Sequence, residues 1–367
     1  MMKVCFFANP YSPHVRHWLE GVKSLDDIDV DIYHIHHNST DIELKDSVNT
    51  YNLVPNFLSF LPASIQYFLL GIIFKLTCRK SYRVIHAHNT SGYGLSALLT
   101  GKPYGVTTYG SEIFLREHKS KVYNKIIKRV LDGAVFITAS SPKMSNVLSK
   151  ELVSKDKIKE FSLGVSPAFY YSLSEGVEWR QKLGLTQDDR LIVINRRVAP
   201  LYRTKEVIEA FNEVFASSDD PTFHLLVLSG DCDKSYERDI ENLTNSYKNV
   251  HLLGNFLSQR ELSGILSSSD FSVSVPRTDQ LSSSILESMT CQCIPILADL
   301  DSYKTVRDNA ILISNDNFEL AVRSAFERVK TMPACEIVRR KLELESESKE
   351  FDIKKKIRSY HQVLKSL

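Results

Sequence analysis

Residues Val275 to Asp299 read Val-Pro-Arg-Thr-Asp-Gln-Leu-Ser-Ser-Ser-Ile-Leu-Glu-Ser-Met-Thr-Cys-Gln-Cys-Ile-Pro-Ile-Leu-Ala-Asp, and they follow the apolar run Phe271–Val275. This order predicts a buried strand, a turn and an amphipathic helix that begins in three serines. Free N–H groups and the helix dipole make such a helix start a good phosphate site. Asp279 and Glu287, one on each side of the turn, can accept hydrogen bonds from sugar hydroxyls. The segment therefore fits a nucleotide-sugar site, or else an N-capped helix of an ordinary α/β domain.

The size and composition of the chain indicate a globular protein of two domains. With 367 residues it exceeds most single cores, and 43% hydrophobic and 25% charged residues are ordinary values. A net charge of +2 argues against a dedicated nucleic-acid binder. We expect no secretory signal, because Met1–Ala8 is a short apolar run typical of a first strand. The six scattered cysteines are expected in the core of a cytoplasmic protein, with no disulfide framework or metal site.

Short apolar runs alternate with helical patterns along the whole chain. In the first half these runs are Lys3–Ala8, Val30–His34, Val84–Ala87, Gly105–Thr108 and Gly133–Thr138. In the second half they are Leu191–Asn195, Phe223–Leu228, Val250–Leu253, Phe271–Val275 and Ile294–Leu297. The alternation predicts βαβ units, and hence an α/β chain of two Rossmann-like domains with a boundary between Gly164 and Gly184. Open parallel sheets bind ligands beyond the carboxyl ends of their strands, so we expect a site in the cleft between the domains.

Two segments of the first half combine apolar and basic residues. Ser47–Phe74 contains no charged residue, and its strongly apolar part, Ile65–Phe74, is followed by four basic residues up to Arg83. A second basic cluster spans Arg116–Arg129 on a predicted helix. Apolar helices with basic flanks suit the surface of an anionic membrane, whereas the apolar run is too short to span one. The alternative for Ile65–Arg83 is a buried helix with a solvated basic end.

The chain resembles the retaining glycosyltransferases of family 4, which have the GT-B architecture of two facing Rossmann-like domains. The acid pair Asp279-x7-Glu287 matches the family's E-x7-E motif, with Asp where Glu is usual. The segments Ile85-His-Ala-His-Asn and Gly101–Glu112 match the amino-terminal domain, and Leu163-Gly-Val165 matches the linker. The resemblance implies an acceptor-binding domain at 1–165, a nucleotide-sugar domain at 166–345, and a helix at 346–367 that crosses back to the first domain.

The resemblance also implies roles for particular residues. Asp279 would contact the donor sugar, Glu287 the ribose, and Tyr109 would take the catalytic position of a family His. An Arg and a Lys hold the diphosphate in the family; an ungapped match puts Arg197 and Tyr202 there, whereas a one-residue shift favours Arg196. The diphosphate candidates are Arg196, Arg197, Arg203, Lys205, Ser282, Ser283 and Ser284. The nucleoside candidates are Glu287, Gly254, Asn255, Phe256 and Leu257, and the acceptor-side candidates are Tyr11, His14, Arg16 and Glu112.

These residues predict retaining transfer of a sugar from a UDP- or GDP-linked donor to a saccharide or lipid-linked acceptor. No metal motif is present, so basic residues and the serine-rich helix start would stabilise the leaving diphosphate. The setting implied by the resemblance is bacterial surface polysaccharide assembly (lipopolysaccharide or capsule) at the cytoplasmic face of the inner membrane. His86 and His88 are expected in core or hydrogen-bonding roles and not as zinc ligands. A nucleotide-sugar 2-epimerase and a non-catalytic subunit of the same architecture are the alternatives.

Overall fold

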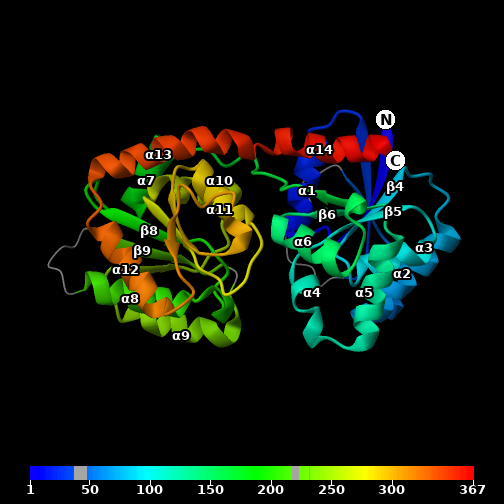
Figure 1. Cartoon of the computed structure of the whole chain (residues 1–367), viewed down its shortest axis with the longest axis horizontal. Helices are drawn as coiled ribbons and strands as arrows, with labels where there is room; N and C mark the ends of the chain where they lie inside the picture. The colour runs from blue at the N-terminus through cyan, green and yellow to red at the C-terminus, as the bar shows by residue number, and fades with distance from the viewer. Residues whose placement is uncertain (37–47, 217–222, 231) are drawn as a thin grey trace. The chain divides into compact units, whose positions relative to one another are not determined.

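The computed structural model describes residues 1–36, 48–216, 223–230 and 232–367. The chain divides into two units, of which unit 1 comprises Met1–Leu163 and Ile353–Leu367 and unit 2 comprises Gly164–Asp352. The observed boundaries therefore lie close to position 165 but after position 345, because helix α13 (Ala334–Ser348) belongs wholly to unit 2. Both units are α/β and are built on parallel sheets (Figure 1).

Unit 1 is built on a seven-stranded parallel sheet in the order β3-β2-β1-β4-β5-β6-β7. Its strands are β1 (Met2–Phe7), β2 (Ile28–His34), β3 (Asn49–Asn52), β4 (Val84–His88), β5 (Tyr104–Thr107), β6 (Phe136–Ala139) and β7 (Ile158–Glu160). Val4 of β1 lies between Val30 and Val84 of the neighbouring strands. Strands buried on both faces need near-continuous apolar runs, as Val4–Phe7 of β1 provides, whereas β2 carries Asp29 and Asp31.

Helices cover both faces of this sheet. They are α1 (Pro13–Lys23), α2 (Ala63–Thr77), α3 (Tyr93–Thr100), α4 (Ser111–Phe114), α5 (Lys121–Gly133), α6 (Pro142–Glu151) and α14 (Ile353–Ser366), with single turns η1 (Asn56–Leu58), η2 (Arg116–His118) and η3 (Lys155–Lys157). Helices α1 and α14 share one core layer with β1, and α2, α3 and α5 share the layer on the other face. The last helix of the chain therefore completes the core of unit 1.

Unit 2 is built on a six-stranded parallel sheet in the order β10-β9-β8-β11-β12-β13. Its strands are β8 (Arg190–Ile194), β9 (Phe223–Leu228), β10 (Val250–Leu253), β11 (Phe271–Ser274), β12 (Ile294–Ala298) and β13 (Ile311–Ile313). Its helices are α7 (Leu173–Lys182), α8 (Thr204–Phe215), α9 (Lys234–Asn245), α10 (Gln259–Ser268), α11 (Ser283–Thr290), α12 (Phe318–Lys330) and α13, with turns η4 (Pro200–Tyr202), η5 (Asp301–Tyr303) and η6 (Lys349–Phe351). Helices α8, α9 and α12 lie on one face, and α7, α10, α11 and α13 on the other (Figure 1).

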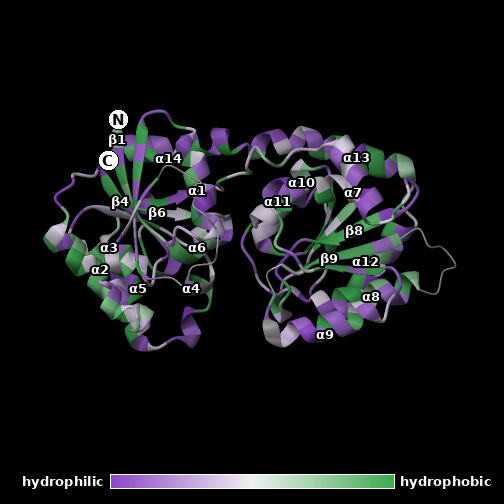
Figure 2. Cartoon of the chain, turned by 180° about the vertical axis from the view of Figure 1, so that it is seen from behind, coloured by the Kyte–Doolittle hydropathy of each residue, from purple (hydrophilic) through white to green (hydrophobic). Residues whose placement is uncertain are grey.

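Figure 2 colours the chain by hydropathy and shows largely hydrophobic strands, and helices that carry both hydrophobic and hydrophilic residues. Among the described residues, no helix combines the length and the apolar character that crossing a bilayer requires. None of the six cysteines, all within the described ranges, forms a disulfide; Cys5, Cys291 and Cys293 are buried, while Cys335 is exposed.

Candidate active site

The helix start predicted to bind phosphate is formed by the β11–α11 turn of unit 2. Ser282 caps α11, and its hydroxyl accepts a hydrogen bond from the Ser284 N–H at 3.3 Å. The hydroxyl oxygens of Ser282 and Ser284 lie 2.8 Å apart, and Ser283 is exposed. An N-cap serine leaves the other first-turn N–H groups without helical partners, so the turn offers both amide and hydroxyl donors to an anion.

Arg196 joins this helix start to Asp279. Its guanidinium donates to the Asp279 carboxylate at 2.7 Å and to the Ser284 hydroxyl at 3.0 Å. Tyr303 of η5 donates its hydroxyl to the same Asp279 oxygen at 2.8 Å, and the Tyr202 ring stacks on Arg196 with 4.6 Å from the guanidinium carbon to the ring centroid. Arg196 is buried and Asp279 is partly exposed. The buried Arg196 thus lies beside a partly exposed carboxylate and two serine hydroxyls. Such an arginine can bind a second anion, such as a phosphate group, in addition to the Asp279 carboxylate.

Glu287 lies on α11, one helical turn beyond Ser283 and Ser284. The residue is partly exposed, but desolvation of its carboxyl group raises its pKa to about 7, while a hydrogen bond with Ser283 and the charge of Arg196 oppose that rise. A carboxyl group with a pKa near neutrality changes protonation state within the physiological range. Ligand hydroxyls that donate to it would stabilise the ionised form.

The other three basic candidates for the diphosphate are not gathered at this turn. Arg203 is buried, donates to the Asn315 side-chain oxygen at 2.9 Å and stacks on Phe318 at 4.1 Å, so it connects the loops after β8 and β13. Arg197 is exposed, and its charge lowers the pKa of Asp233 together with hydrogen bonds from Ser235. Lys205 is exposed on α8, 3.9 Å from Glu209. Of the alternatives left open by the sequence, the structure favours Arg196.

The predicted nucleoside segment Gly254–Leu257 follows β10, at the same edge of the sheet as Asp279 but on its outermost strand. Phe256 is exposed, and so are Gly254 and Asn255. A Cβ at Gly230, after β9, would lie 2.9 Å from the Asn255 carbonyl oxygen, so the two loops approach closely. The segment is therefore open to a ligand, but no described side chain in it contacts Arg196 or Glu287 directly.

Unit 1 gathers several acceptor-side candidates at the carboxyl edge of its own sheet. The Tyr109 hydroxyl lies 2.9 Å from His88 Nδ1, and the ring of His14, which is exposed, lies 5.2 Å from the Tyr109 ring. Arg16 is partly buried and its Nε has no hydrogen-bond partner among the described residues. Tyr11 is partly buried and donates its N–H to the Asn9 side chain.

Glu112 has a different environment from the one expected of an acceptor contact. It is buried, and its carboxylate accepts hydrogen bonds from the Thr90 N–H and hydroxyl, both at 2.8 Å, and from the Tyr109 N–H at 3.2 Å. Burial raises the pKa of Glu112, and these donors oppose the rise. The carboxylate is thus occupied in joining the loops after β4 and β5, which corrects its placement among residues that face an acceptor.

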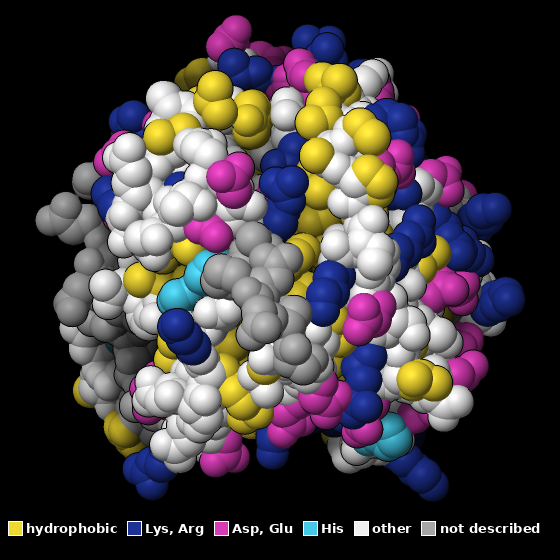
Figure 3. Space-filling model, turned by 90° about the vertical axis from the view of Figure 1, so that its left-hand side faces the viewer, with side chains coloured by type: hydrophobic (Ala, Val, Ile, Leu, Met, Phe, Trp, Pro, Cys, Tyr) yellow, Lys and Arg dark blue, Asp and Glu magenta, His cyan; other side chains and the backbone are white. Residues whose placement is uncertain are grey.

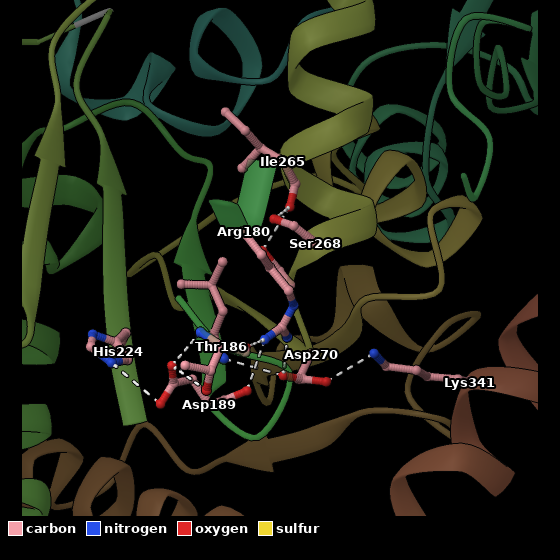
Figure 4. A network of polar contacts seen from close by, with 10 residues as sticks. Arg180, Thr186, Asp189, His224, Ile265, Ser268, Asp270 and Lys341 are labelled. Atoms are coloured by element: carbon pink, nitrogen blue, oxygen red, sulfur yellow. Dashed lines mark hydrogen bonds and ion pairs between the residues drawn. The ribbon is translucent and has the colours of Figure 1, made fainter. Parts of the chain in front are cut away.

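The amino-terminal edge of the unit 2 sheet carries a second Arg–Asp cluster (Figure 4). Asp270 accepts from Arg180 at 3.0 Å, from Lys341 at 2.9 Å and from the Leu191 N–H at 3.1 Å. Arg180 also donates to the carbonyl oxygens of Thr186 and Asp189. Three protein donors thus satisfy the buried Asp270 carboxylate, and the cluster connects α7, β8, β11 and α13.

Sequence reasoning missed Tyr303 and did not anticipate how His88 would be used. Tyr303 follows β12 and is 24 positions from Asp279, and nothing in the pattern of Leu300–Tyr303 marks it as a site residue. His86 is in the core as expected, with hydrogen bonds to Thr107 at 2.8 Å and Tyr360 at 2.9 Å. Within the described ranges, no three His, Cys, Asp or Glu side chains form a group that could hold a metal ion. Metal independence stays a prediction.

Comparison with known proteins agrees with this geometry. Residues 3–141 match the family model "Glycosyl transferase 4-like", and residues 177–324 match "Glycosyl transferases group 1". A comparison with curated proteins by sequence finds no match.

Several solved structures share the fold over the whole chain. A sucrose-phosphate synthase from Thermosynechococcus elongatus superposes with a TM-score of 0.82 at 16% identity, and the alignment covers 100% of both chains. HepE from Anabaena, solved with UDP and glucose, has a TM-score of 0.78 at 15% identity with the same coverage. An α,α-trehalose-phosphate synthase (UDP-forming) from Burkholderia vietnamiensis has a TM-score of 0.75 at 12% identity, again with 100% of both chains covered. At these identities the likeness establishes the fold.

Proposed function

The chain belongs to the family 4-type glycosyltransferases of GT-B architecture, and we propose that it transfers a sugar from a nucleotide-diphosphate donor with retention at the anomeric carbon. The observation that carries the proposal is the cluster of Arg196, Asp279 and Ser284 at the start of α11. It combines a buried cation, hydroxyl and amide donors and a carboxylate at one strand–helix turn. Those are the groups that a diphosphate and an adjoining sugar require.

A UDP-linked sugar is the donor that we favour. HepE from Anabaena was solved with UDP-glucose, and an Escherichia coli protein of the same fold with UDP-2-fluoro glucose. In this chain Glu287 would hold the ribose hydroxyls, the Gly254–Leu257 segment would contact the base, and Asp279 would contact the transferred sugar. The ionised form of Glu287 is the one that accepts hydroxyl hydrogen bonds.

The reaction would proceed by attack on the face from which the diphosphate leaves. The bond between the anomeric carbon and the diphosphate oxygen breaks, the acceptor oxygen bonds to that carbon, and the acceptor's proton passes to the departing diphosphate. Arg196, the serine hydroxyls and the amides of α11 would stabilise the negative charge that develops on the leaving group, in place of a metal ion. Because Arg196 is paired with Asp279 in the free protein, donor binding would have to share the guanidinium between phosphate and carboxylate.

For the acceptor we propose a saccharide carried on a lipid at the cytoplasmic face of a bacterial inner membrane, in surface polysaccharide assembly. Helix α2 supports this setting, because it buries Leu70, Gly71 and Phe74 but exposes Ile65 and Phe68. The preceding segment exposes further apolar side chains, with Phe57 at 74% and Phe60 at 79% of their full accessibility. Exposed aromatic residues next to basic ones suit the interface of an anionic bilayer.

Basic residues flank this apolar surface. Lys75 is exposed in the last turn of α2, and Arg79 and Arg83 are exposed after the helix, while Lys80 is paired with Asp31 at 2.9 Å. Most of the second basic cluster lies on α5, which covers the same face of the sheet as α2; Lys121, Lys125 and Arg129 are exposed there, while Lys128 pairs with Asp132 at 3.4 Å and Arg116 of η2 pairs with Glu151. Acidic and basic side chains are interspersed on the face of the molecule shown in Figure 3. An excess of basic side chains is what an anionic membrane attracts.

The donor is tested by thermal shift against a panel of nucleotides and nucleotide sugars, with and without magnesium. A ligand of the folded state raises the melting temperature by mass action. We expect a selective shift with one nucleotide sugar that does not depend on magnesium and that is lost in Arg196→Ala. Sugar turnover without an acceptor would instead support an epimerase, and the lack of any shift would contradict the donor site.

Membrane association is tested by flotation with vesicles that contain anionic phospholipid. The double variant Phe57→Ser/Phe60→Ser should float several-fold less than the wild type, because burial of each aromatic ring contributes about 1.5–3 kcal/mol. Leu320→Ser is a matched control, since Leu320 is 64% exposed on α12 of unit 2. Equal flotation of all three proteins would contradict the proposal.

A further inference from the structure

His14, His88 and Tyr109 come from three strand ends that lie side by side. His14 follows β1, His88 is the last residue of β4, and Tyr109 follows β5. These three strands are neighbours in the sheet. His88 Nδ1 lies 2.9 Å from the Tyr109 hydroxyl, and the Tyr109 and His14 rings are 5.2 Å apart. The structure thus joins a buried histidine to a partly exposed phenol at the functional edge of unit 1.

His88 is enclosed by aromatic side chains. It is 2% exposed, and its ring centroid lies 4.6 Å from that of Phe6 and 5.5 Å from that of Trp18. Burial, together with the nearby His86 and His14, lowers the pKa of His88 well below its ordinary value. The imidazole is therefore neutral at physiological pH and carries a single N–H.

The position of that proton follows from the second ring nitrogen. His88 Nε2 is buried and has no hydrogen-bond partner among the described residues. A buried N–H without an acceptor is rarer in proteins than an acceptor without a donor. The proton therefore belongs on Nδ1, from which it is donated to the Tyr109 oxygen.

This assignment determines what Tyr109 can offer. Burial and the charge of Glu112 raise the pKa of Tyr109 far above its usual range, so its hydroxyl keeps its hydrogen. Since the Tyr109 oxygen accepts a hydrogen bond from His88, the hydroxyl hydrogen of Tyr109 takes no part in the hydrogen bond between the two residues. It can be donated to an oxygen atom of a ligand.

The backbone around the pair is held in place from both sides. Glu112 accepts from Thr90, two residues after His88, and from the Tyr109 N–H. Asn89 has a φ of 112°, a conformation that residues other than glycine rarely adopt, and its side chain accepts from the Gly92 and Tyr93 N–H groups at 2.9 Å each. Backbone strain of this kind is retained where a side chain must be aimed.

We propose that His88 is a positioning residue that keeps the Tyr109 hydroxyl oriented as a hydrogen-bond donor to an oxygen atom of the sugar substrate. The inference rests on the proposed function and deepens it, because it assigns the polarity of the contact. The hydrogen of a phenol without partners can lie on either side of the C–O bond in the ring plane, whereas a phenol oxygen that accepts from Nδ1–H on one side directs its hydrogen to the other. The pair supplies a fixed donor without a positive charge.

The test compares His88→Phe with Tyr109→Phe and with the double variant. We expect each single change to lower kcat by about 10²-fold, as loss of orientation does, with little change in the KM for the donor. The double variant should be no slower than the slower single variant, because the two residues act as one unit. His88→Asn, whose side-chain amide can donate from the place of Nδ1, should recover most of the activity.

His86→Asn is the matched control, since His86 lies on the same face of β4 and is equally buried. It should lower the melting temperature without changing kcat, because its partners are Thr107 and Tyr360 of the core. Additive losses in the double variant, or unchanged kcat in His88→Phe, would overturn the proposal.

A second readout does not depend on turnover. Nitrogen-15 spectra of histidine-labelled protein distinguish protonated from unprotonated ring nitrogens, and we expect Nδ1 of His88 to be protonated. Protonation at Nε2 would overturn the proposal even if His88→Phe does not fold. A protein that carries the Nδ1 proton but transfers no sugar would instead contradict the proposed function and leave the orientation of the hydroxyl intact.

Discussion

The two edges of the unit 2 sheet each carry an Arg–Asp pair, yet the pairs differ in the number of cations on the aspartate and in its exposure, which is 5% for the Asp270 side chain and 19% for that of Asp279. At the amino-terminal edge, Asp270 has two cations and a backbone N–H, and the charges of Lys341 and Arg180 outweigh burial and lower its pKa. At the carboxyl edge, Asp279 has one guanidinium, one tyrosine hydroxyl and the Gln280 N–H, and it lies beside the start of helix α11.

The difference shows how one interaction serves stability in one place and binding in another. A buried charge with a full set of partners avoids the large free-energy cost of an unpaired charge, so removal of one partner strongly lowers the stability of the fold. A charge cluster with spare donors can exchange partners when a ligand arrives. The same fold therefore places its structural ion cluster where strands begin and its candidate site where strands end.

Removal of Asp270 should have the largest effect on stability. In Asp270→Ala, Arg180 and Lys341 lose their shared carboxylate, and the free energy of unfolding should fall by about 3–5 kcal/mol. Urea denaturation measures the change, and turnover per folded molecule should be preserved. Arg339→Ala is the control, since its pair with Glu336 is on the surface, where solvent screens the charges, and should contribute little to stability. Equal effects of the two variants would contradict the comparison.

Removal of Asp279 should instead affect turnover much more than stability. We expect Asp279→Ala to lower kcat by about 10²–10³-fold, because a charged group facing the reacting sugar is lost. Nucleotide affinity should be kept or increased, since Arg196 is released from its carboxylate, and isothermal titration measures this. Asp301→Ala is the control, because Asp301 is an exposed acid at the start of η5. The assignment of Asp279 fails if turnover is unchanged.

The raised pKa of Glu287 should make both the stability of the fold and nucleotide binding depend on pH. Its folded pKa of about 7 lies above the ordinary 4.5, so the folded state keeps a proton that the unfolded chain releases between these values. Stability from this group is complete below about pH 4.5 and decreases as the pH rises to about 7. Urea denaturation of wild type and Glu287→Gln across this window isolates the contribution.

The same group should make nucleotide affinity rise with pH. The ionised carboxylate accepts hydrogen bonds from ribose, so binding of UDP should strengthen by up to about tenfold as the pH increases through 7. In Glu287→Gln the affinity should be weaker and nearly independent of pH. A wild-type affinity that falls with rising pH over this range would refute the assignment to ribose.

Replacement of Lys205 should have the smallest effect on nucleotide affinity. The lysine is exposed on α8 and its ion pair with Glu209 is long at 3.9 Å, so Lys205→Ala should change nucleotide affinity by less than about twofold. Arg196→Ala in the same titration should abolish detectable binding. Similar losses in both variants would mean that the lysine reaches the diphosphate after all.

The strands that are buried on both faces were predictable because they need apolar runs. The predicted segments Phe223–Leu228 and Val250–Leu253 coincide with β9 and β10. Strand β3 was not predicted, because Asn49–Asn52 is polar and lies at the edge of the sheet, where one side needs no apolar partner. The short strands β7 and β13 were missed as well, since three residues carry too little pattern.

Local order along the chain was enough to establish the α/β class, two parallel sheets and the serine-capped helix with its two acids. These features depend on residues close together in the sequence, whose periodicity and capping chemistry act over a few positions. The choice of Arg196 over Arg197, the pairing of Tyr303 with Asp279 and that of His88 with Tyr109 depend on contacts between distant segments. Packing sets which side of a loop faces inward, and no spacing in the sequence records that, so these contacts became known only from the folded chain.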